Sequence, residues 1–96
     1  MPSYRVTMII GALQPGSAPA AVLPTAAAAA AELTTVEASD LALVQGAPRV
    51  TVRFTADDAQ QALGIGRHVI EATRTVADPV SSVVTERVHG SWVAVR

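Results

Sequence analysis

The clearest structural signal in the chain lies in residues 49–72, which read RVTVRFTADDAQQALGIGRHVIEA. In the first part of this stretch, polar and apolar side chains alternate, and Val50, Val52 and Phe54 fall in the same phase. A period of two is typical of a strand with one buried face. The spacing of apolar residues then changes to three and four, which indicates an amphipathic helix directly after the strand.

This helix is marked at both ends. Thr55 lies where an N-cap residue is expected, and Asp58 completes a variant of the capping box. We expect the helix to end at Asp78-Pro79, because proline cannot continue a helix. Gly64 and Gly66 each cost about 1 kcal/mol relative to alanine inside a helix. They predict, in this order, close packing against the alanine-rich helix of the chain, a local kink, or contact with a partner.

A similar strand and helix are indicated nearer the N-terminus. Polar and apolar residues alternate over residues 4–10, as in a second half-buried strand. Ser17 is placed to cap a following helix, which contains the alanine run Ala26–Ala31. Pro24 costs roughly 3 kcal/mol inside a helix. The helix therefore either kinks at this proline or properly begins there.

Two further β segments are predicted. We expect residues 37–44 to form a strand, although they alternate poorly, and the turn residues Gln45–Pro48 to join it to residues 49–54 as a hairpin. Residues 80–96 are rich in valine, but their alternation changes phase near His89-Gly90. A one-residue shift turns every later side chain to the opposite face. The chain therefore either bulges there or turns back as a hairpin with an extra C-terminal strand.

The elements follow one another in the order β-α-β-β-α-β. Right-handed crossovers over so short a chain favour the split β-α-β arrangement. We therefore expect residues 1–96 to form a single α+β domain with the ferredoxin-like βαββαβ plait. Its four-stranded antiparallel sheet would have the order 4-1-3-2, with both helices on one face. This fold hosts many unrelated activities and does not by itself indicate a function.

Composition narrows the possible functions. Half of the residues are hydrophobic and 16% are charged, which excludes intrinsic disorder. The net charge of −1 provides no overall attraction to nucleic acid or to an anionic membrane. The absence of cysteine excludes disulfides and cysteine nucleophiles. No secretory signal or membrane-spanning stretch is evident, so we expect a cytoplasmic protein.

The candidate site lies on the face of the predicted sheet that the helices leave open. If Tyr4 and Phe54 point toward the helices, then Arg5 and Arg53 point away from them. Arginine offers a planar fork of donors for anions, and tryptophan offers a plane for stacking. The candidate ligand or interface residues are Arg5, Thr7, Arg53, Arg87, His89 and Trp92.

Several kinds of site are not indicated. His68 and His89 lack the spacing of metal ligands, and we expect neither a metal nor a cofactor. No nucleophile motif supports a catalytic serine. The open face lacks the stacked aromatic residues that an RNA-binding sheet needs, so nucleic acid is disfavoured.

These observations favour a non-catalytic α+β module. We expect it to act through the open sheet face, either as a homo-oligomer or by binding another protein. The alternative is a small-molecule-binding protein or a small enzyme of the dimeric α/β-barrel type. Two sheets would then face each other around a pocket lined by arginine, histidine and tryptophan, with a small anionic or aromatic ligand inside it.

Overall fold

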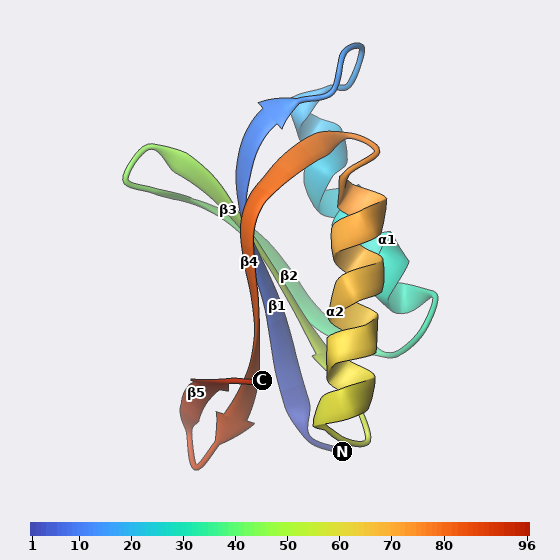
Figure 1. Ribbon diagram of the computed structural model, residues 1–96, viewed down its shortest axis with the longest axis vertical. Helices are drawn as coiled ribbons and strands as arrows, with labels where there is room; N and C mark the ends of the chain where they lie inside the picture. Colours follow the sequence, from blue (N-terminus) through green and yellow to red (C-terminus); the bar gives the residue numbers. More distant parts are fainter.

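The computed structural model describes residues 1–96 and shows an α+β architecture (Figure 1). Five strands form one antiparallel sheet, and two helices pack on one of its faces. The strands are β1 (Ser3–Leu13), β2 (Val36–Val44), β3 (Ala47–Thr55), β4 (Ala77–Val88) and β5 (Ser91–Ala94). The helical elements are the 3₁₀ turn η1 (Pro19–Ala21), α1 (Val22–Ala31) and α2 (Ala59–Thr73).

The sheet has the order β2-β3-β1-β4-β5, which places β1 at its centre. Every pair of neighbouring strands is antiparallel. The expected four-stranded sheet of order 4-1-3-2 does not match this arrangement, because β5 adds a fifth strand beside β4. Read from the β5 edge, the observed order is 5-4-1-3-2. The two edges of the sheet are therefore β2 and the β4-β5 hairpin.

The phase change near the C-terminus is a hairpin turn and not a bulge. His89 and Gly90 have φ values of 49° and 82°. Two successive positive φ values are the mark of a type I′ turn, whose twist matches that of the strands it joins. Arg87 then pairs with Trp92 across the hairpin. The extra C-terminal strand is therefore present, as β5.

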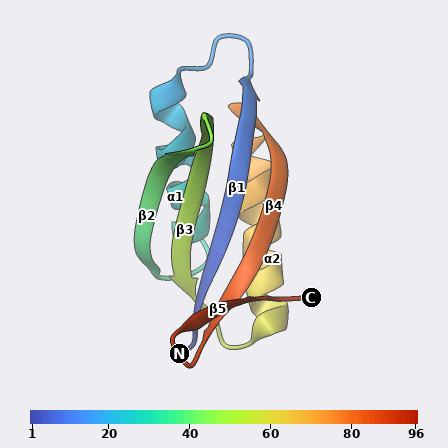
Figure 2. The same ribbon diagram turned by 90° about the vertical axis from the view of Figure 1, so that its left-hand side faces the viewer.

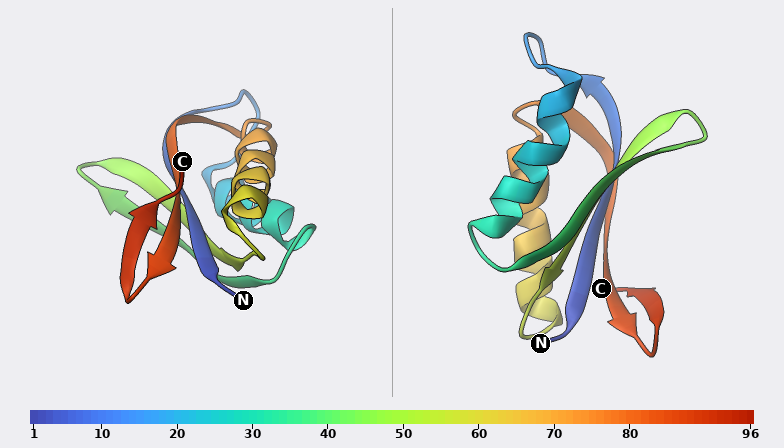
Figure 3. Two further views of the ribbon diagram at one scale, coloured as in Figure 1. Left: turned by 60° about the horizontal axis from the view of Figure 1, so that its bottom comes forward. Right: turned by 180° about the vertical axis from the view of Figure 1, so that it is seen from behind.

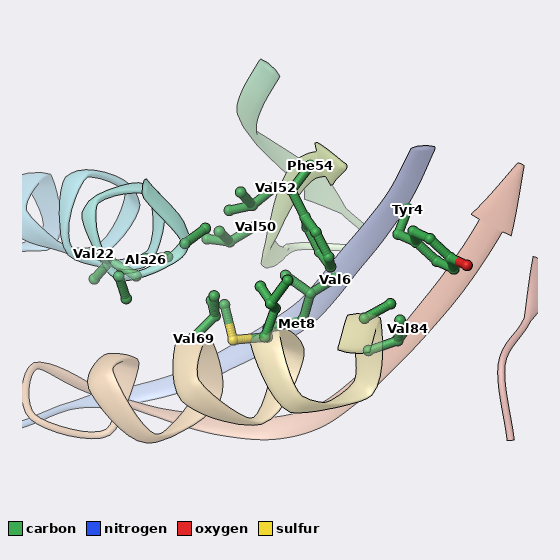
Figure 4. Close-up of a cluster of buried hydrophobic side chains, with 14 of the residues drawn as sticks. Tyr4, Val6, Met8, Val22, Ala26, Val50, Val52, Phe54, Val69 and Val84 are labelled. Atoms are coloured by element: carbon green, nitrogen blue, oxygen red, sulfur yellow. The ribbon is translucent and has the colours of Figure 1, made fainter. Parts of the chain in front are cut away.

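The core lies between the sheet and the two helices, as Figure 4 shows. Each inward-facing residue predicted from the two alternating strands is at most 1% exposed: Tyr4, Val6, Met8, Val50, Val52 and Phe54. The rings of Tyr4 and Phe54 are stacked, with their centroids 6.2 Å apart. The fully buried residues of α1 are valine and alanine: Val22, Ala26, Ala29 and Ala30, while Leu23 packs against the core partly exposed. These small side chains let α1 lie close to the sheet.

The first helix begins near Pro24 and does not kink there. Pro24 is the third residue of α1, within the first turn, where its missing N–H costs no helical hydrogen bond. The 3₁₀ turn η1 leads directly into this helix. Ser17 does not cap it, contrary to the prediction. Ala21 occupies the N-cap position and makes no side-chain capping bond.

The second helix begins later than predicted. Asp58 is the N-cap residue, and its carboxylate accepts a 2.8 Å hydrogen bond from the N–H of Gln61. Gln61 in turn accepts a 2.6 Å hydrogen bond from the N–H of Asp57. These two bonds form a variant of the capping box, in which Gln61 accepts from the N–H of the residue before the N-cap. Asp58, and not Thr55, is therefore the N-cap. Thr55 closes β3 instead.

The second helix also ends earlier than predicted. It stops at Thr73, and Asp78 and Pro79 belong to β4. Pro79 pairs with Ile10 at a point where the register between β1 and β4 shifts. A residue without an N–H is tolerated in a strand at such an irregularity.

The two glycines of α2 have different surroundings. A Cβ atom added at Gly66 would lie 2.6 Å from Cγ2 of Val84 and 3.8 Å from Cγ2 of Val6. Gly66 therefore brings α2 close to the sheet, and not to α1 as predicted. A Cβ at Gly64 would meet nothing within 4 Å.

Candidate functional site

The middle of the sheet face opposite the helices is uncovered. Figure 2 looks onto this face, with α1 and α2 behind the sheet. Arg5 pairs with Arg53, and Thr7 pairs with Thr51, across β1 and β3. Their side chains point away from the buried residues with which they alternate. This face therefore presents arginine and threonine, in agreement with the alternation in the sequence.

The β4-β5 hairpin curls over one end of this face. Figures 2 and 3 show β5 running across the sheet near the start of β1. Cζ of Arg5 lies 3.9 Å from the centroid of the Trp92 ring. The corresponding distances are 5.3 Å for Arg53 and 5.7 Å for Arg87. Cation–π attraction extends to about 6 Å and is worth about 0.5–1 kcal/mol at an exposed site. Arg5, as the nearest cation, contributes most to holding Trp92 over the sheet.

A carboxylate of β2 joins this cluster from the other side. Oε1 of Glu37 accepts a 2.7 Å hydrogen bond from the hydroxyl of Ser3 and lies 3.2 Å from Nε of Arg53. The hydrogen bond from Ser3 is the main reason why the pKa of Glu37 is lowered. Partial burial opposes this effect, and the positive charge of Arg53 adds to it.

We expect the Glu37→Gln substitution to change how stability depends on pH. Since the pKa of Glu37 is lower in the folded chain, its contribution is fully present above the ordinary value of 4.5. That contribution disappears as the pH falls through the lower folded-state value. The variant should therefore be less stable than wild type near neutral pH, with the difference vanishing in acid. The effect should be small because the carboxylate is 35% exposed.

Chemical denaturation over a series of pH values measures this difference. Ser3→Ala, which removes the main cause of the lowered pKa, should move the loss of stability to higher pH. Identical pH profiles for wild type and Glu37→Gln would contradict the prediction.

Beside Trp92, the open face contains a polar hollow of about 280 Å³. Its lining residues are Arg5, Ala38, Ser39, Asp40, Arg49, Thr51 and Arg53. The lining therefore contains three guanidinium groups but only one carboxylate, that of Asp40. Arg5 and Arg49 form no ion pair within the chain. Their donors are free to bind the oxygen atoms of an anion, which guanidinium groups bind in a planar, two-point geometry.

We refer to Arg5, Arg49, Arg53, Arg87 and Trp92 together as the basic patch. It contains four of the seven arginines, whereas only two of the eight carboxylates, Glu37 and Asp40, accompany it. The patch and these two carboxylates carry a formal charge of +2, and the rest of the chain carries −3. The net charge of −1 therefore conceals a separation of charge between the patch and the rest of the molecule.

The structure brings together some of the predicted site residues but not all. Arg5, Arg53, Arg87 and Trp92 form one cluster. Thr7 lies on the same face but does not line the hollow. His89 is an exposed residue of the hairpin turn and lines no hollow.

Other residues of this region are not predicted as site residues. Arg49 and Thr51 follow from the alternation of β3, which places them on the open face. No pattern in the sequence pairs Glu37 with Ser3 or sets Asp40 beside the hollow, because β2 alternates poorly. In addition, a register shift between Val36 and Ala38 moves Glu37 relative to β3.

The fold and this region define an α+β protein with a basic, tryptophan-bearing patch on its open sheet face. No protein-family model, curated protein or solved structure matches the chain. No group of three or more histidine, aspartate or glutamate side chains is placed to hold a metal ion. Neither of the two helices has the length and apolar character needed to cross a membrane.

Proposed function

We propose that the protein is a non-catalytic binding module whose basic patch binds an acidic segment of another protein. The observation that carries this proposal is the polar hollow, in which three arginines meet and two of them lack an ion-pair partner. An acidic segment would supply carboxylates to these arginines. Trp92 would add a large, partly exposed surface of the kind that often anchors a partner.

A second copy of the chain is a poorer occupant of the same patch. Two patches facing each other would bring two sets of four arginines together. Like charges placed opposite each other across an interface cost several kcal/mol. The charge of the patch therefore favours a partner of opposite sign over direct self-association through this surface.

A small anionic or aromatic ligand is the second candidate, as in a protein of the dimeric α/β-barrel type. It is favoured by the same hollow and by the exposed part of the Trp92 ring plane. The volume of about 280 Å³ is slightly below that of ligand pockets, which usually measure about 300–1,000 Å³. The hollow is also open to solvent and not enclosed by the chain. These features favour an extended partner over an enclosed ligand.

We further propose that the fold is a ferredoxin-like plait to which β5 has been added. The order of helices and strands from β1 to β4, with both helices on one face, supports this classification. On this view, β5 is the addition that brings Trp92 to the arginines.

Fluorescence of the single tryptophan tests the proposed function directly. Trp92 lies within the patch, so binding there should change its emission. An acidic peptide such as oligoglutamate should bind, and its affinity should fall as salt rises. Replacing both Arg5 and Arg49 by glutamine should weaken binding by about tenfold or more, since hydrogen bonds to charged groups contribute about 1.5–3 kcal/mol each.

Replacing both Arg67 and Arg74 by glutamine is the matched control, because it also removes two positive charges, from exposed positions on α2 and at its C-cap. Equal loss of affinity in the control would indicate attraction by overall charge and would contradict a specific site. Binding of citrate, phosphate or benzoate but not of the peptide would support the second candidate. Absence of binding by every probe would refute both.

A further inference from the structure

A second surface of the molecule is independent of the basic patch. Strand β2 is an edge of the sheet, so one side of its backbone has no strand to pair with. The two-residue turn at Gln45 and Gly46, with φ values of 52° and 80°, closes the β2-β3 hairpin on the pair Val44 and Ala47. Such a turn closes on a hydrogen-bonded pair, and bonded and non-bonded pairs then alternate. The N–H and C=O groups of Leu41 and Leu43 therefore point away from β3, to the free edge.

The two halves of this edge differ in chemistry. The first half contains Glu37 and Asp40, whereas residues 41–44 read LALV. Leu41 is 44% exposed and Leu43 is 73% exposed. Protein edges are usually protected from pairing by charges, prolines or bulges. The register shift of β2 lies near Val36, so nothing of this kind protects its second half.

An apolar hollow lies beside the same half of β2. Its volume is about 280 Å³, and it is lined by Ile10, Gly11, Leu13, Pro19, Val22, Leu41 and Pro48. Leu43 follows Leu41 by two residues and so lies on the same side of the strand. Leu43 itself does not line the hollow, because the β2-β3 hairpin extends beyond the body of the molecule there (Figure 3). Each molecule thus offers an exposed leucine and, next to it, an apolar hollow.

We propose that β2 pairs in antiparallel fashion with β2 of a second copy, about a twofold axis at Ala42. In this register, Leu41 of each copy lies opposite Leu43 of the other. Both leucines direct their backbone groups to the free edge, so the pair can exchange two hydrogen bonds. Leu43 of each copy would then lie beside the apolar hollow of its partner.

Self-complementarity is the reason to choose a second copy over another partner. A twofold interface requires that one surface supply both halves of each contact. In the register about Ala42, Leu41 and Leu43 of each copy supply both halves of the contact. The same register sets Asp40 opposite Val44, so no two charges face each other. The two sheets would join into one, with both basic patches exposed on the same side.

The mass of the protein in solution tests the proposal. Size-exclusion chromatography with light scattering should show a dimer for wild type. Leu43→Arg should be monomeric, because it sets a charge into the apolar contact. Leu33→Arg is the matched control, since Leu33 is also an exposed leucine (54%) but lies after α1. A monomeric wild type, or a dimer that survives Leu43→Arg, would overturn the proposal.

A single cysteine tests the register, because the chain contains none. Ala42 faces itself across the proposed axis, in a non-hydrogen-bonded pair with Cβ atoms about 4.5–5.5 Å apart. Mild oxidation of Ala42→Cys should therefore give a covalent dimer at high yield. Ala38→Cys lies on the same strand, but in this register it faces Gly46, so it should remain largely uncrosslinked. Equal crosslinking of both variants, or of neither, would overturn the register.

Discussion

The Phe54→Ala variant is expected to lose about 3–5 kcal/mol of its free energy of unfolding. Phe54 is fully buried at the end of β3, and its ring is stacked with that of Tyr4. Removal of the ring loses the transfer free energy of its apolar surface and leaves a cavity against rigid strands. A domain of ordinary stability has about 5–15 kcal/mol in total, so this change would leave it marginal.

Urea denaturation followed by circular dichroism measures this loss. Phe54→Leu should lose less, because leucine leaves a smaller cavity. Val93→Ala serves as the surface control: Val93 is 50% exposed on β5, and its truncation should change stability by no more than about 0.5 kcal/mol. Similar losses for Phe54→Ala and Val93→Ala would show that the aromatic pair does not belong to the core.

The Gly66→Val variant is expected to show the second largest loss, about 1–3 kcal/mol. The Cβ atom of any residue at this position would meet Cγ2 of Val84 at 2.6 Å, which is closer than such atoms can approach. The helix must then move away from β4, or Val84 must leave its preferred rotamer. Gly64→Ala, two residues away on the same helix, should instead gain about 0.5–1 kcal/mol, because that position is open and alanine favours the helix.

The steric clash expected at Gly66 can be tested by also truncating Val84, the side chain that it would meet. Gly66→Ala should fail to give the gain expected of Gly64→Ala, because the clash offsets the helix propensity. In the background of Val84→Ala, the same substitution should become favourable. Thermal and urea unfolding of the four proteins in this cycle give the coupling free energy between the two positions. A gain from Gly66→Ala equal to that from Gly64→Ala, with no coupling, would refute the close approach of α2 to β4.

Both ends of α2 were predicted wrongly, and each error has a local cause. Thr55 and Asp58 are both good N-cap residues, and only the partnership of Asp58 with Gln61 decides between them. Pro79 is read as the end of a helix because proline breaks helices. It is accommodated in β4 by a register shift against β1, which no local pattern reveals.

The candidate site was predictable only where the strands that carry it alternate clearly. Arg5 and Arg53 share a face because each alternates with buried residues of its own strand. For Arg87 and Trp92, the sequence left open whether the chain bulges or turns back between them, so it did not decide whether they share a face. Glu37 and Asp40 could not be placed, because β2 has no clear alternation and carries a register shift.

Alternation within β1 and β3 was enough to determine which side of each strand is buried, because adjacent side chains on a strand must point to opposite faces. The same local rule placed arginine and threonine on the uncovered side. Only the tertiary structure decided that Trp92 lies over Arg5 and that two guanidinium groups of the hollow lack a carboxylate partner. Those relations join residues far apart in the chain. They depend on the curl of the β4-β5 hairpin and on the edge position of β2, which are properties of the assembled sheet and of no single segment.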